Sequence, residues 1–270
     1  SAQPGINAVT LSQLVVSLPD LSTQRKVADI LDVYDAKIEN NNLIIKKLET
    51  IAQYIFDEWF VKFRFPEHKD IKFVNSEMGK IPEKWRIGRV KDLIHVESGF
   101  PFSSSIFDDS GKYKLVTIRN VQDGSFVTEC ENYIGTLPDK LPAHCMLRSG
   151  NILLSLTGNV GRICLVNGND YVLNQRVSVL IPVKERDRAY TYFLFRRKDF
   201  QNLLISISKG TAQLNLSPVE TKNLEIVIPG ENMLERYAKI AMPTYNKIVE
   251  IHSENLKLKE SRDQLLAKLI

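Results

Sequence analysis

Residues 24–60 read QRKVADILDVYDAKIENNNLIIKKLETIAQYIFDEWF, and this stretch sets the architecture of the chain. Apolar side chains recur in it at alternating steps of four and three residues from Val27 to Trp59, and Asn41 lies in the same series. Side chains at this spacing line one face of a helix, and a sustained heptad stripe is the seam of a coiled coil. We therefore predict a continuous coiled-coil helix over residues 23–60.

The C-terminal end of the chain repeats this pattern. Residues 1–60 align without gaps on residues 211–270, and the same alternating steps start again at Tyr237. This second seam is poorer, because it contains Thr244 and Arg262. Pro243, between two seam positions, should start or kink the helix, because proline lacks the backbone N–H that a helix interior needs. We predict a second coiled-coil helix over residues 231–270. The chain thus resembles the tail of one unit followed by one whole unit.

The two seams also predict how the helices pair. If the helices run antiparallel with Asn41 opposite Asn255, every seam position faces a seam position, including Ile45 opposite Ile251. Two facing amides satisfy each other's hydrogen bonds and disfavour other registers, so Asn41 and Asn255 are predicted to set the coiled-coil register. The alternative is that each amphipathic helix packs separately on an ordinary helical core.

Between the two helical segments the sequence changes character. Residues 61–79 mix charged residues with Pro66 and lack a helical period, which predicts a linker. Over residues 80–230, short β-rich runs alternate with turn residues, and one helix is expected at 190–206. The predicted strands are 115–118, 151–155, 162–166, 171–172, 177–182 and 224–228.

These elements together predict an α+β fold. One part is a mixed β-rich domain that has short helices and a twisted, partly closed sheet. The other part is a long antiparallel two-helix coiled coil. Gly158-Asn159-Val160-Gly161 is interpreted as a hairpin turn, because it lacks the lysine and third glycine of nucleotide-binding loops.

Composition restricts the class of protein. The chain has 270 residues, of which 43% are hydrophobic and 25% charged, as expected of a globular protein. No stretch approaches the roughly 18 unbroken apolar residues of a membrane span, and Ser1-Ala2-Gln3-Pro4 lacks the features of a signal peptide. We expect a cytoplasmic protein without membrane contact. Its three cysteines, without CxxC spacing, are expected to be reduced and packed.

The common catalytic signatures are missing from the sequence. It has no GxxxxGK[ST], GxSxG or HExxH motif, no acidic cluster suited to a magnesium nuclease, and no cofactor box of an amino-methyltransferase. The four histidines have no metal-ligand spacing. We therefore predict a binding protein rather than an enzyme, with no metal and no cofactor in this chain. A nuclease or methyltransferase that acts alone is the disfavoured alternative.

Charge and side-chain type indicate a nucleic-acid partner. Residues 80–230 contain 20 Lys and Arg against 15 Asp and Glu, a modest excess of positive charge. Arginine, asparagine and glutamine suit the edges of guanine and adenine, and serine, threonine and lysine suit phosphates. The residues of these types selected as a predicted DNA interface are Ser103, Ser104, Lys112, Lys114, Arg119, Asn120, Asn159, Arg162, Gln175, Arg176, Lys209, Thr211 and Gln213.

Several stretches, in this order, resemble the specificity (S) subunit of type I restriction-modification systems. They are LPDLSTQRKV at 18–27, SEMGKIPEKW at 76–85, VESGFP at 96–101, LRSGNILLS at 147–155, TGNVG at 157–161, LNQRV at 173–177 and KGTAQLNLS at 209–217. The resemblance covers nearly the whole chain and rests on the order and spacing of the stretches.

The resemblance implies a target-recognition domain at 80–230 between the helices 23–60 and 231–270, and it makes residues 1–22 the remnant of a preceding recognition domain. We expect residues 1–20 to be extended, mobile or captured by another chain. The chain would then be the C-terminal part of a longer subunit, or a truncated gene product, in the cytoplasm of a prokaryote.

The implied partners are double-stranded DNA, read at one half of a bipartite site, and methyltransferase (M) subunits. Restriction (R) subunits would join through the complex, and S-adenosylmethionine would be bound by the methyltransferase. A homodimer would restore two recognition domains. The alternative function is a protein-binding coiled-coil scaffold, a degenerate or truncated specificity subunit that no longer reads DNA.

Overall fold

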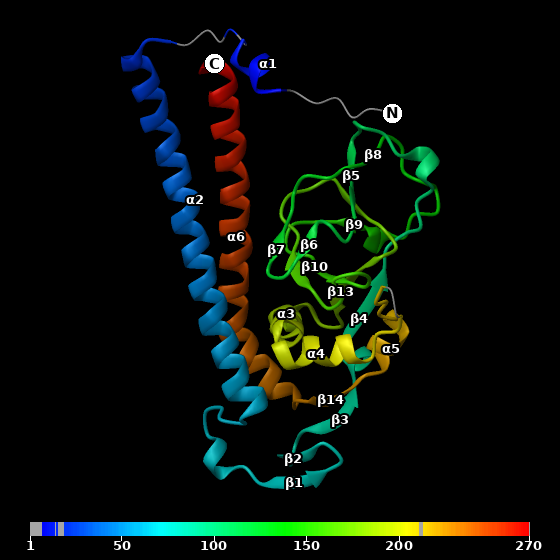
Figure 1. Ribbon diagram of the computed structural model, residues 1–270. Coiled ribbons are helices and arrows are strands. Elements are labelled where there is room, and N and C mark those ends of the chain that lie inside the picture. Colours follow the sequence, from blue (N-terminus) through cyan, green and yellow to red (C-terminus); the bar gives the residue numbers. More distant parts are fainter. Residues whose placement is uncertain (1–6, 14, 16–18, 211–212, 270) are drawn as a thin grey trace. The chain divides into compact units, whose positions relative to one another are not determined.

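The structure is a computed structural model that describes residues 7–13, 15, 19–210 and 213–269 (Figure 1). Two compact units make up the chain: residues 41–257, and residues 1–40 together with 258–270. Helices α2 (Leu21–Phe56) and α6 (Glu231–Leu269) contribute to both units. The predicted α+β fold, a β-rich domain with short helices and two long helices, is confirmed.

The two long helices form where the heptad series predicts them. The side chain of Asp20 starts α2, because its two carboxylate oxygens accept from the backbone N–H (3.0 Å) and the hydroxyl (2.8 Å) of Thr23. These bonds lower the pKa of Asp20. Helix α6 begins at Glu231, before Pro243, and continues through it. None of the helices in the described ranges is long and apolar enough to cross a membrane.

Within the unit of residues 41–257, Asn41 and Asn255 face each other at the predicted register. Asn41 Nδ2 donates to Asn255 Oδ1 at 2.8 Å, and Asn255 Nδ2 donates to Asn42 Oδ1 at 2.9 Å. Asn41 and Asn255 are only 2% and 6% exposed. Because buried polar groups are costly without partners, this pair restrains the helices to one alignment.

The unit of residues 1–40 and 258–270 differs from the sequence prediction at its start. Ala8–Ser12 form a short helix, α1, which the side chain of Asn7 caps by accepting from Thr10 N at 2.8 Å. The prediction of an extended segment is therefore wrong for these residues, because the local asparagine cap satisfies the first turn of a helix. In the same unit Arg262 forms an ion pair with Asp35 at 2.6 Å.

The predicted linker contains regular structure. A π-helical turn at Asp57–Val61 follows α2, and strands β1 (Phe73–Ser76) and β2 (Gly79–Pro82) form an antiparallel hairpin. Ser76 Oγ supports the turn by accepting from Met78 N at 3.2 Å. The sequence prediction of this segment did not include the hairpin.

The central sheet of the β-rich domain has the strand order β11-β10-β13-β4, and all neighbours are antiparallel. Its strands are β4 (Ile94–Ser98), β10 (Ile152–Ser155), β11 (Ile163–Leu165) and β13 (Val177–Pro182). All four residues of β10 are buried. Ile152 and Leu154 pack in one core and Leu153 packs in another, so the sheet is covered on both faces.

A second four-stranded sheet has the order β8-β5-β12-β9, and β5 and β12 are parallel. Its strands are β5 (Tyr113–Val116), β8 (Tyr133–Ile134), β9 (Met146–Leu147) and β12 (Tyr171–Leu173). Two-stranded pairs are formed by β3 (Arg86–Arg89) with β14 (Glu225–Ile228) and by β6 (Val121–Gln122) with β7 (Ser125–Phe126). The structure thus has separate sheets where one partly closed sheet was predicted. Residues of both large sheets, including Leu173 and Val179, lie in one core. The prediction differed because local sequence patterns do not show which strands pair.

The helix predicted at 190–206 is two helices, α3 (Arg188–Arg196) and α4 (Lys198–Ser206), because Arg197 between them is extended. A third short helix, α5 (Pro218–Asn223), precedes β14. Aromatic side chains bind this domain to the long helices. The ring centroid of Phe60 lies 4.8 Å from Tyr237 of α6 and 4.9 Å from Tyr190 of α3. Each such contact adds about 0.5–1.5 kcal/mol beyond its buried area.

Candidate nucleic-acid interface

Three connections that are distant in sequence meet at one end of the central sheet. They are the β10–β11 hairpin turn, the turn between β12 and β13, and the loop between α4 and α5. Leu156 joins them, because its N–H donates to Arg176 O (3.1 Å) and its carbonyl accepts from Leu216 N (2.7 Å). Gly158 N also donates to Leu214 O at 3.2 Å. The backbone therefore holds the three connections together.

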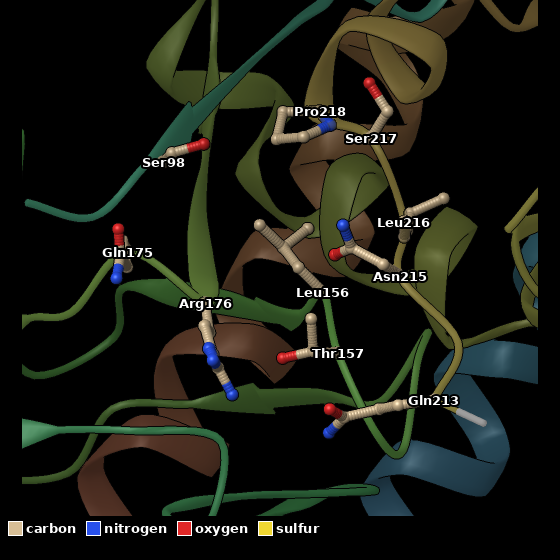
Figure 2. A pocket seen from close by; sticks show the side chains of 10 residues that line it. All are labelled: Ser98, Leu156, Thr157, Gln175, Arg176, Gln213, Asn215, Leu216, Ser217 and Pro218. Carbon is tan, nitrogen blue, oxygen red and sulfur yellow. The ribbon is translucent and has the colours of Figure 1, made fainter. Parts of the chain in front are cut away.

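The three connections enclose an open hollow of about 560 Å³ (Figure 2). Most of its lining is polar. In Figure 2 the hydroxyl of Thr157 points toward the side chain of Arg176, and the amide of Gln213 lies close by. The lining residues are Ser98, Leu156, Thr157, Gln175, Arg176, Gln213, Asn215, Leu216, Ser217 and Pro218.

Gln175 and Arg176 reach the hollow from the turn that follows β12. Asn174 shapes this turn, since its Oδ1 accepts from Gln175 N at 2.7 Å and its carbonyl accepts from Val177 N at 3.1 Å. Gly99 lies against the same turn, where a Cβ would come within 2.2 Å of the Asn174 carbonyl oxygen. The side chains of Gln175 and Arg176 remain exposed.

Gln213 is presented by a tight loop. Two backbone bonds close it: Lys209 N donates to Asn215 O at 3.0 Å, and Asn215 N donates to Lys209 O at 2.8 Å. Gly210 has φ +124°, and a Cβ there would lie 2.2 Å from Gln213 O, so this position requires glycine. Lys209 points outward and forms an ion pair with Glu220 at 2.5 Å. Thr211 lies outside the described residues.

The hollow therefore brings together Gln175, Arg176 and Gln213 from the predicted DNA interface. It also contains Ser98, Thr157, Asn215 and Ser217, which the sequence selection left out. Thr157 Oγ1 is buried, and among the described residues it has no hydrogen-bond partner. Thr157 and Asn215 lie within the TGNVG and KGTAQLNLS stretches, which would have been the signal for them.

Asn159 and Arg162 lie beside the hollow, in and after the β10–β11 turn. Arg162 is half-buried and donates to Gln122 Oε1. With its amide oxygen turned toward Arg162, Asn159 accepts from both Nη atoms at 3.3 and 3.2 Å. The Arg162 guanidinium therefore forms hydrogen bonds with protein side chains.

Asn120 does not fit the predicted role. It is 3% exposed, its Oδ1 accepts from Thr117 N at 2.9 Å, and its Nδ2 donates to the carbonyls of Val127 and Glu129, both at 2.9 Å. The Asn120 amide therefore forms its hydrogen bonds with backbone groups and is not available to bind a base edge. We correct its assignment from a DNA contact to a support of the loop over 117–130.

The other predicted residues do not line the hollow. Ser103 starts a short helical turn containing Ser104, and it accepts from Ser105 N at 3.3 Å. Lys112 and Lys114 lie over the rings of Tyr113 and Tyr171, at 5.1 and 5.2 Å from the centroids. Arg119 is exposed and forms an ion pair with Glu131.

The lining of the hollow supplies hydrogen-bond donors and acceptors. Over the described ranges, no group of three or more His, Cys, Asp and Glu residues could hold a metal ion. The three cysteines are free thiols, and burial raises the pKa of Cys130 to about 11. A thiol with so high a pKa is a poor nucleophile at neutral pH. The exposed donors and acceptors around Arg176 can form hydrogen bonds with a polar ligand.

Comparison with known proteins gives a consistent result. The family described as "Type I restriction modification DNA specificity domain" matches residues 1–50 and 82–259. The type I restriction enzyme MjaIX specificity subunit of Methanocaldococcus jannaschii is 26% identical over 275 residues, which cover 100% of this chain and 63% of that protein. The type I restriction enzyme HindI specificity subunit of Haemophilus influenzae is 23% identical over 324 residues, which cover 99% of this chain and 70% of that protein.

A solved structure has a similar fold. The type I restriction-modification S subunit from M. genitalium superposes with a TM-score of 0.56 at 16% identity. The superposition covers 93% of this chain and 61% of that one. The chain thus spans less than two thirds of both the MjaIX subunit and this S subunit.

Proposed function

Because the chain belongs to the family of type I restriction-modification DNA specificity domains, we propose that its β-rich domain reads one half of a bipartite DNA site. The chain itself is a recognition component without catalytic chemistry. Methyl transfer from S-adenosylmethionine to adenine belongs to methyltransferase subunits that it directs to DNA. The second half of the site is read by another recognition domain, in a longer subunit or in a second copy of the chain.

The observation that carries this proposal is the meeting of Gln175, Arg176 and Gln213 around one hollow. An arginine can donate twice to guanine O6 and N7, and a glutamine can pair with adenine N6 and N7. Asn215 adds a further amide to the lining of the hollow. Backbone bonds hold the turns that carry these side chains, so the three side chains stay around one hollow.

The methyltransferase subunits dock on the exposed face of α2. Ile45 and Ala52 of α2 are buried in the seam, whereas Ile51 and Tyr54 are 58% and 63% exposed. Leu43 and Ile44 are exposed as well. A second apolar stripe on a helix whose first stripe is already packed fits a partner helix or groove. Restriction subunits join through the assembled complex.

The test is selection of DNA by the full chain in complex with its methyltransferase subunits. The complex is incubated with a random duplex pool, and bound duplexes are sequenced. We expect a short motif to be enriched. Complex formation without enrichment would instead support the scaffold function.

Single substitutions then assign the contacts. Arg176→Ala should lower discrimination at one base position by about 5- to 150-fold, the equivalent of about 1–3 kcal/mol. Arg148→Ala is the matched control, because Arg148 is exposed, carries the same charge and does not line the hollow. Equal losses in the two variants would contradict base reading by Arg176.

A further inference from the structure

Arg162, selected from sequence as a DNA contact, is half-buried and is held by protein groups on two sides. Its guanidinium donates to Gln122 Oε1 in strand β6 and to the Asn159 amide oxygen in the β10–β11 turn. Several bonds to one planar guanidinium fix its orientation as well as its position. Arg162 therefore joins the turn to the β6–β7 hairpin.

Gln122 is fixed in turn. Its Nε2 donates to Arg119 O at 2.9 Å while its Oε1 accepts from Arg162, so both ends of the amide are used. A backbone bond from Gly124 N to Ile163 O, 2.7 Å long, ties the same hairpin to β11. The hairpin is thus attached to the β10–β11 turn by a side-chain bond and to β11 by a backbone bond.

The tip of this hairpin is anchored on the helices. Asp123 Oδ1 accepts from Arg196 of α3 and from Gln201 Nε2 of α4, the latter at 2.9 Å. Arg196 also lies 3.6 Å from Glu49 Oε2 of α2. Gly124 allows this approach, since a Cβ there would lie 2.7 Å from Arg196 Nη2. Ion pairs and hydrogen bonds therefore run from α2 through α3 to the hairpin.

The β10–β11 turn needs such support. Gly158 and Gly161 both have positive φ, +68° and +80°, and glycine leaves the backbone many other conformations. Gly158 also lies under Gln213, because a Cβ on it would be 3.5 Å from Gln213 Nε2. A shift of this turn would therefore displace the wall of the hollow.

We propose that Arg162 is a positioning residue, which holds the β10–β11 turn against the β6–β7 hairpin and so keeps the hollow in its reading geometry. Gln122 is its partner, and Asp123 anchors the hairpin. The positioning itself is independent of the ligand, and its effect on DNA discrimination rests on the proposed function.

The first measurement is made without DNA. Backbone amide exchange at Gly158 and Gly161 is followed in the full chain, since these amides donate to Leu214 O and Ser155 O. Arg162→Ala and Gln122→Ala should each raise exchange roughly five- to tenfold, the size expected for lost net hydrogen bonds. The double variant should add little, because both single changes break the same contact. Unchanged exchange in Gln122→Ala would overturn the proposal.

The second measurement separates positioning from phosphate contact. In DNA binding by the complex with methyltransferase subunits, Arg162→Ala, Arg162→Lys and Gln122→Ala should all lower sequence discrimination and leave the salt slope unchanged. Lysine keeps the charge but lacks the planar set of donors, so Arg162→Lys should not restore sequence discrimination. A salt slope reduced by about 0.9 in Arg162→Ala, with rescue by lysine, would make Arg162 a phosphate contact and overturn the proposal.

The two measurements fail independently. If the wild-type complex enriches no sequence while exchange still rises in the Arg162 and Gln122 variants, the proposed function is wrong and the positioning holds. Arg148→Ala again serves as the control and should change neither exchange nor discrimination. Because Gln122→Ala leaves the arginine in place, it also tests the proposal if Arg162→Ala fails to fold.

Discussion

The buried asparagine pair of the coiled coil allows a quantitative prediction. After Asn41→Leu, Asn255 Oδ1 loses its donor, but Asn255 Nδ2 keeps its bond to Asn42. After Asn255→Leu, Asn41 loses the Asn255 bond while it remains buried. An unsatisfied buried polar group costs about 1–3 kcal/mol, so both variants should be destabilised, and Asn255→Leu more than Asn41→Leu.

The double variant should behave in the opposite way. When both positions are leucine, an apolar contact replaces the asparagine pair. Asn42 is exposed, so its side chain can form hydrogen bonds with water instead. Replacement of a buried polar pair by apolar residues is often neutral or stabilising, and we expect a gain of about 1–2 kcal/mol. Without the amides the register should loosen, which would broaden the distance between spin labels at residues 46 and 247.

Urea unfolding of the wild type, both single variants and the double variant measures these changes as shifts of the midpoint at constant slope. Asn40→Leu, at an exposed position of the same helix, is the control and should change the free energy of unfolding by less than about 0.5 kcal/mol. If the effect of the double variant equals the sum of the two single effects, the asparagines are not coupled and the reasoning is refuted.

Three further outcomes are expected. Ile51→Glu should weaken binding of methyltransferase subunits at least tenfold in calorimetric titration without lowering the melting temperature, and an unchanged affinity would contradict docking at this face. Asn120→Ala should lower the free energy of unfolding by about 2–4 kcal/mol in urea, because three backbone groups lose their partner, while the folded fraction keeps its sequence preference. Burial raises the pKa of Cys130 to about 11, so the folded state holds this proton more tightly than the unfolded state. Its contribution to stability is complete below about pH 9 and is lost as the pH rises toward 11, and Cys130→Ser should reduce that loss in unfolding measured at pH 8 and pH 11.

The sequence predicted best where one pattern continues over many residues. The heptad series placed α2 and α6, and the positions of two asparagines within it were enough to predict the Asn41–Asn255 contact. Strand β13 was predicted with its observed ends, Val177–Pro182, because apolar residues run through it between turn formers. Short or interrupted elements were missed: helices α1 and α5, strands β1 to β4 and β6 to β9, and the break at Arg197.

For the candidate site, the sequence indicated the kind of side chain but not its environment. Asn120 and Gln175 are both amides in predicted loops, yet Asn120 is enclosed by backbone groups and Gln175 lines the hollow. Arg162 and Arg176 are equally suited to guanine by type, and only Arg162 is engaged by Gln122. The number of free donors on a side chain depends on neighbours that a local pattern does not reveal.

The sequence by itself therefore determined the long helices, their register, six of the strands and the polar character of the loops at the hollow, because these follow from periodicity and side-chain chemistry along the chain. Tertiary structure alone decided which strands share a sheet, which loops meet and which polar groups stay free. The hollow exists because Leu156 bonds to Arg176 and to Leu216, residues far away in sequence. Such contacts depend on the packing of the whole domain, so the same arginine can contact a ligand at one position and hold a turn at another.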